Sequence, residues 1–261
     1  MAQDDKPPFE PLFHARRDDD LSSHRHRVVI GALGAALPLL VCLISWLRPS
    51  HPALTEPLSS ISAYYYSGAV AVFTGILAGL AIYFFTYSGY DNAHHWKDRI
   101  TSVIAGIAAI GVACFPTIAP APPFELPWWH PYLGTIHFYC ATALFGGFIV
   151  FALFLFPKSR RSREDRPVAK KARNIVYYVC GLTMLVCMVI AGIRSRQGHP
   201  IFWLESVALE AFAVSWLVKG RVHWTAKQLL HRARRPVTFA KHVVRTARQP
   251  RRGRPSSLEP Q

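Results

Sequence analysis

The stretch 59-SSISAYYYSGAVAVFTGILAGLAIYFFTYSGY-90 opens with three serines, continues with three consecutive tyrosines, and then runs uncharged to its end. Tyr83, Tyr87 and Tyr90 close the apolar run. Aromatic rings at both ends of a long apolar segment are typical of the two water–lipid interfaces of a bilayer. The stretch therefore predicts a membrane-spanning helix with a polar mouth at its start.

Small residues recur within this stretch. Gly68, Gly75 and Gly79 are separated by seven and four residues, so they share one face of a helix. Small residues on one face let neighbouring helices approach closely in lipid. We expect this face to be a packing surface for another helix.

Six apolar runs of 18 to 25 residues divide the chain, which is 51% hydrophobic over its 261 residues. A transmembrane helix needs about 20 apolar residues. The pattern predicts an all-α fold, a bundle of six transmembrane helices in a membrane domain of residues 28–219. The predicted spans are 28–47, 63–87, 100–119, 132–156, 175–193 and 201–218.

Basic residues follow these spans unevenly. The net charge is +15, and 27 of the 30 Lys and Arg side chains fall on one side of the predicted bundle. Positive residues stay on the cytoplasmic side of a membrane, so both termini are predicted to be cytoplasmic. We expect a multi-pass protein of the cell membrane, which in a bacterium is the inner membrane. We expect no nucleic-acid partner.

The two tails differ from the membrane domain in composition. Residues 1–27 are polar and mixed in charge, and we expect a disordered cytoplasmic N-tail. Residues 220–261 alternate basic and apolar side chains, which predicts a partly amphipathic cytoplasmic C-tail. Such a segment next to a span favours contact with anionic lipid headgroups. The sequence does not identify a protein partner.

Ionisable side chains inside spans are rare and informative, because charge in hydrocarbon is costly. The exceptions are His137, Glu205 and Glu210, which fall in the outer half or the centre of their spans. Ser62 lies in the serine-rich mouth of the second span, on the same side. We therefore predict an outward-facing polar pocket, formed by Ser62, His137, Glu205 and Glu210.

Structural roles for the same residues stay open. Glu205 can pair with Arg194 or Arg196, and His137 can hydrogen-bond a backbone carbonyl. Glu210 and Ser206 are four residues apart and can satisfy each other. The two glutamates are five residues apart, about 140° around a helix, so they do not both face one small site squarely.

A zinc site is a sharper form of the pocket hypothesis. Zinc takes nitrogen and carboxylate oxygen ligands, so His137 and Glu210 are weak metal candidates. No two ligands share a helix at spacings of three or four, and we expect no cofactor. The chain also has no HExxH, GxSxG or GxxxxGK[ST] motif, which makes an enzyme less favoured.

The run SISAYYYSGAVAVFTGILAGLAIYFFTYSGYD, followed by DRITSVIAGIAAIGVACFPT, resembles an uncharacterised family of bacterial six-span membrane proteins. That resemblance implies the location and the span count, and no activity. A more distant similarity is to alkaline-ceramidase-like membrane hydrolases, which implies Ser62 and His137 as remnants of a zinc site. The HxxxH pair that those hydrolases carry in the last span is absent here.

The sequence thus favours a non-enzymatic multi-pass membrane protein that binds a lipid or a small ligand in an outward pocket. Two alternatives remain open. One is a metal-dependent membrane lipid hydrolase built on His137 and Glu210. The other is a small solute or proton-coupled transporter that uses Glu210.

Overall fold

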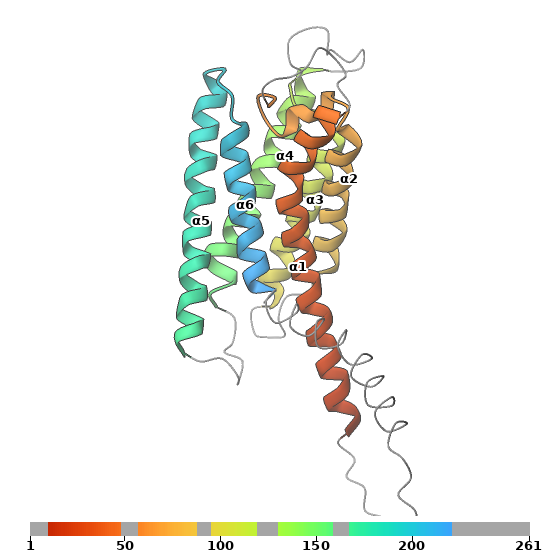
Figure 1. Cartoon of the computed structure of the whole chain (residues 1–261), viewed down its shortest axis with the longest axis vertical. Helices are drawn as coiled ribbons and strands as arrows, with labels where there is room; N and C mark the ends of the chain where they lie inside the picture. Colours follow the sequence, from red (N-terminus) through yellow and green to blue (C-terminus); the bar gives the residue numbers. More distant parts are fainter. Residues whose placement is uncertain (1–9, 48–56, 88–94, 119–129, 159–166, 221–261) are drawn as a thin grey trace, which may run out of the picture. The chain divides into compact units, whose positions relative to one another are not determined.

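The computed structural model describes residues 10–47, 57–87, 95–118, 130–158 and 167–220, and within these ranges the chain is all-helical without strands (Figure 1). This confirms the predicted all-α class. The helices are α1 (Glu10–Leu47), the 3₁₀ helix η1 (Ser62–Tyr66), α2 (Val70–Thr86), α3 (His95–Cys114), α4 (Pro131–Val150), the π-helix η2 (Phe151–Leu155), α5 (Pro167–Arg196) and α6 (Phe202–Lys219).

Prolines set several helix boundaries. Pro131 and Pro167 are the first residues of α4 and α5, where the missing amide proton is not needed. Pro116 follows the end of α3, because a residue before proline is pushed out of the helical conformation. The local sequence therefore fixes where three of the long helices begin or end.

A glycine closes α5 and turns the chain into α6. Gly198 has a φ of 75°, a conformation that favours glycine. The amide of His199 donates to the Arg194 carbonyl at 3.0 Å, and the amide of Gly198 donates to the Ser195 carbonyl at 3.1 Å. These two bonds form a Schellman motif, which satisfies the last carbonyls of α5.

The helices lie side by side along one axis, and α6 lies between α1 and α5 (Figure 1). Aromatic side chains from four helical elements fill the centre of the bundle. The rings of Phe148 and Phe212 stack at a centroid distance of 3.8 Å. The fully buried members of this core are Phe84, Phe148, Phe151, Phe212 and Trp216.

The π-helix η2 ends the α4 segment, and the backbone carbonyl that follows it accepts a hydrogen bond from a buried cation. The amide of Phe156 bonds five residues back, to the Phe151 carbonyl, at 2.9 Å. The Phe156 carbonyl accepts a hydrogen bond from Lys219 Nζ at 3.0 Å. This contact ties the last turn of α6 to the end of the α4 segment.

Helices α1 and α6 approach each other closely at two glycines of α1. A side-chain carbon at Gly34 would lie 2.6 Å from the Phe212 ring, and one at Gly31 would lie 3.0 Å from the Ala213 carbonyl oxygen. The predicted packing face of α2 is different. A side-chain carbon at Gly75 would meet nothing within 4 Å, so that expectation is wrong at Gly75.

Among the described residues, three helical segments are long and apolar enough to cross a membrane: His24–Leu47, Pro131–Leu155 and Lys170–Arg196. Val70–Thr86 is apolar but shorter. The other two long helices carry more charge. Helix α6 contains Glu205, Glu210 and Lys219.

Two predicted boundaries differ from the helices. The predicted span 63–87 is divided into η1 and α2, because Ser67 adopts an extended conformation between them. Helix α1 begins at Glu10, inside the segment predicted to be disordered. That segment has no glycine or proline between Pro11 and Gly31, so nothing in it interrupts a helix. The predicted C-tail, beyond residue 220, lies outside the described residues.

Candidate functional site

A short segment before α2 crosses the N-terminal end of α6. We call residues 59–66, which include η1, the strap. The Ser59 carbonyl accepts hydrogen bonds from the amides of Ile201 at 2.7 Å and Phe202 at 3.0 Å. The first amides of any helix lack partners within the helix itself. The Ser59 carbonyl of the strap is the acceptor for these amides here, so the strap is attached to the start of α6.

Glu205 makes the bond in the opposite direction. It lies in the first turn of α6, and its Oε2 accepts a hydrogen bond from the Ile61 amide at 2.6 Å. A carboxylate in the first turn is also favoured by the helix dipole. Within the described residues the second carboxylate oxygen, Oε1, has no hydrogen-bond or ion-pair partner. Glu205 therefore holds the strap with one oxygen and keeps the other uncommitted.

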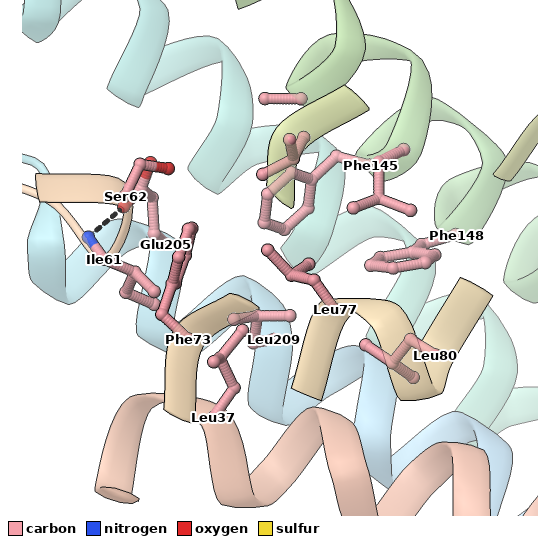
Figure 2. Close-up of a pocket in the computed structure, with 13 residues that line it drawn as sticks. Leu37, Ile61, Ser62, Phe73, Leu77, Leu80, Phe145, Phe148, Glu205 and Leu209 are labelled. Carbon is pink, nitrogen blue, oxygen red and sulfur yellow. Dashed lines mark hydrogen bonds between the residues drawn. The ribbon is translucent and has the colours of Figure 1, made fainter. Parts of the chain in front are cut away.

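A partly enclosed cavity of about 40 Å³ lies under the strap. Figure 2 shows Ile61, Ser62 and Glu205 gathered at one end of it, with Leu80 and Phe148 at the other. The lining residues come from the strap, α1, α2, α3, α4 and α6. They are Leu37, Ile61, Ser62, Phe73, Leu77, Leu80, Val112, Ala141, Leu144, Phe145, Phe148, Glu205 and Leu209.

Ser62 is the second polar side chain at this cavity. Its hydroxyl forms no hydrogen bond with any residue that the structure describes. A hydroxyl can both donate and accept, whereas an ionised carboxylate only accepts. The polar end thus offers one acceptor from Glu205 and a donor–acceptor group from Ser62, while the other walls are aliphatic or aromatic.

His137 lies elsewhere. It is buried in α4, and its Nδ1–H donates to the Phe115 carbonyl at 2.7 Å. Pro116 ends α3 directly after that carbonyl and leaves it without a helical partner. His137 therefore caps α3, which is the structural role that the sequence left open, and it does not line the cavity.

Glu210 does not line the cavity either. It is partly exposed on α6, and its carboxylate makes no hydrogen bond or ion pair within the described ranges. The bond with Ser206 that the sequence left open does not form, and the Ser206 hydroxyl donates to the Phe202 carbonyl at 2.8 Å instead. Of the four predicted pocket residues, the structure brings together Ser62 and Glu205.

Two further possibilities can be compared with the geometry. Glu205 forms no ion pair with Arg194 or Arg196 in the part of the chain that the structure describes; the Ile61 amide is its partner. Among these same residues, no three His, Cys, Asp or Glu side chains gather as metal ligands. The arrangement at the cavity suits hydrogen bonding to a small ligand.

Sequence reasoning missed the backbone amide of Ile61 and the apolar walls of the cavity. The walls come from five helices, and a single sequence does not say which apolar side chains meet. The signal that was present is the charge at Glu205, since a carboxylate inside an apolar run needs a hydrogen-bond donor nearby.

No protein-family model, curated protein or solved structure matches the chain. The resemblance to a six-span bacterial family stays a prediction. A functional conclusion therefore depends on the strap, the cavity and the two polar side chains at that cavity, Ser62 and Glu205.

Proposed function

We propose that the chain is a six-span integral membrane protein that binds a small amphiphile under the strap. The ligand has a hydrogen-bond-donating head, an alcohol or a primary amine, and a tail of a few carbons. One observation carries the proposal. The cavity has apolar walls and, at one end, two side chains, Glu205 and Ser62, with uncommitted polar atoms.

Membrane insertion is supported by the surface of the bundle. Three segments are long and apolar enough to span, and the remaining long helices pack among them. Large apolar side chains are exposed around the bundle, including Leu39 on α1, Ile82 on α2 and Val189 on α5. Exposed apolar surface of this extent is typical of contact with lipid. The uneven Lys and Arg distribution favours a strap that faces outward.

The volume of the cavity favours a small ligand over a lipid. One water needs about 10–15 Å³, so a cavity of about 40 Å³ holds about three water-sized groups. A long acyl chain does not fit. A donor head would bond to Glu205 Oε1 and to the Ser62 hydroxyl, and the tail would contact Leu209 and the phenylalanine rings.

The strap connects the ligand to protein stability. The Oε2 atom of Glu205 accepts a hydrogen bond from the strap, and the same carboxylate lines the proposed ligand site. A ligand on Oε1 would therefore fix the carboxylate in the orientation that accepts from Ile61. We expect bound ligand to raise the unfolding temperature of the whole bundle, because it binds the folded state alone.

The test is thermal unfolding of the detergent-purified protein with n-propanol or n-propylamine. The ligand 1-chloropropane is a matched control, because it is similar in size and has no donor. At a ligand concentration of 100 times Kd, binding stabilises the folded state by about 2.7 kcal/mol. We expect stabilisation by the two donors, and a much smaller shift with 1-chloropropane.

Variants locate the binding. Glu205→Gln changes the carboxylate at the cavity, and Glu210→Gln makes the same change on the same helix outside it. We expect the first to weaken the amine response and the second to leave it unchanged. Ala141→Leu fills the cavity and should remove the response to both donors. Equal shifts in wild type and Ala141→Leu, or no shift with either donor, would contradict the proposal.

A further inference from the structure

Helix α6 carries a second, outward stripe that the cavity does not use. Its members are Trp203, Val207, Glu210 and Val214, at spacings of four, three and four. The side chains of Trp203, Val207 and Val214 are 70%, 47% and 44% exposed. At 100° per residue the four positions fall within an arc of about 60°, so they form one narrow seam along the helix.

Glu210 is the one polar residue of this outward stripe. Its carboxylate has no partner within the described residues, and apolar side chains lie one turn away on either side. In a helix that crosses a bilayer, this position faces hydrocarbon. Ionisable groups in spans almost always pair or face a polar interior. The stripe therefore lacks a partner for Glu210 among the residues that the structure describes.

We propose that the outward stripe of α6 pairs with the same stripe of a second copy, with the two Glu210 side chains facing each other. One carboxyl keeps its proton and donates an O–H to the carboxylate oxygen of the other. The same residue thus provides the donor and the acceptor. This proposal rests on membrane insertion of α6, which is part of the proposed function, but not on ligand binding.

The geometry of the stripe favours a second copy over an unrelated helix. Two copies in one membrane have the same orientation, so a two-fold axis along the bilayer normal brings Glu210 opposite Glu210. Spacings of four and three repeat every seven residues, which is the pattern of helices that pack side by side with a left-handed crossing. A different helix would need a donor side chain at the same depth, whereas a second copy has one.

The experiment uses the full chain in lipid vesicles that have been recovered by flotation. Val207→Cys places a thiol in the outward stripe, next to the proposed axis, and Val189→Cys places one on the exposed face of α5 as a control. The chain without an added cysteine gives the background of its five native thiols. Mild oxidation followed by non-reducing electrophoresis measures covalent dimer.

We expect dimer from Val207→Cys and background levels from Val189→Cys. Adding Glu210→Leu should abolish the Val207→Cys dimer, and adding Glu210→Gln should retain it, because two amides also pair with each other. Equal dimer from both cysteines, no dimer from Val207→Cys, or dimer that survives Glu210→Leu would overturn the proposal. An alkaline carbonate wash before flotation removes peripherally bound protein, so recovery then shows insertion, and a failure to associate is separate from a failure to insert. The ligand response of Glu210→Leu reports on the cavity independently.

Discussion

The two faces of α6 carry the same pattern and have different surroundings. The inward face has Glu205, Leu209, Phe212 and Trp216, and the outward stripe has Trp203, Val207, Glu210 and Val214. Each has one carboxyl among three apolar residues, at spacings of four, three and four. Phe212 and Trp216 are fully buried, whereas Trp203 is 70% exposed.

The difference shows what a carboxyl in an apolar helix needs. On the inward face the strap brings a backbone amide to Glu205, and the remaining oxygen faces a cavity. On the outward stripe no described neighbour reaches Glu210. A charge at the centre of a span costs at least about 2.5 kcal/mol. The inward carboxyl therefore has its hydrogen-bond partner within the described bundle, and the outward carboxyl has none among the described residues.

The largest expected effect is at the contact between α1 and the inward face. Gly34→Leu places a side chain against the Phe212 ring, which is already stacked on Phe148. We expect a loss of about 3 kcal/mol in the free energy of unfolding, from overpacking. Chemical denaturation in detergent measures it.

Gly75→Leu is the matched control for this change, because a side-chain carbon at Gly75 meets open space. The higher helix propensity of leucine should leave stability unchanged or raise it by up to about 1 kcal/mol. Similar losses in both variants would mean that the inward face is no more tightly packed than α2.

The next effect is at Glu205. Glu205→Ala leaves the buried Ile61 amide without an acceptor, which costs about 1–3 kcal/mol. Glu205→Gln retains an acceptor oxygen, so the decrease in the free energy of unfolding should be clearly smaller for this variant. Thermal unfolding of the ligand-free protein compares the two. If Glu205→Ala left the unfolding temperature unchanged, the strap would not be held by this bond.

The smallest effect is expected on the outward stripe. Glu210→Ala removes no bond to any described residue, so the unfolding free energy of a single copy should change by less than about 0.5 kcal/mol. It is the control for Glu205→Ala on the same helix. A large loss in dilute detergent would place Glu210 in a contact within the chain and remove the contrast between the two faces.

The sequence predicts the helices well because their signals are local. Apolar length, prolines and glycines place the long helices, and the all-α class follows from them. The packing of α1 on α6 through Gly31 and Gly34 was not predicted. Glycines at suitable spacing also occur in α2, and only the neighbouring helix decides which set is in contact.

The candidate site was partly predictable for the same reason. The charges at Glu205 and Glu210 stand out in an apolar run, but the two stripes of α6 have equal spacing and similar hydrophobicity. Periodicity alone does not say which one faces inward. His137 also stands out, but its hydrogen-bond partner is the Phe115 carbonyl, which follows the end of α3 and precedes Pro116. A single sequence does not show which residues far apart in the chain will form hydrogen bonds of this kind.

The most direct test of the account is whether α6 crosses the membrane. His199→Cys places a thiol before α6 and Arg221→Cys places one after it, each in a chain whose five native cysteines are replaced by alanine. A membrane-impermeant maleimide is added to intact cells that produce either variant. We expect labelling of His199→Cys in intact cells, and labelling of Arg221→Cys only after the membrane is opened. Labelling of both, or of neither, in intact cells would contradict a membrane-spanning α6, and with it the outward cavity and the lipid-facing Glu210.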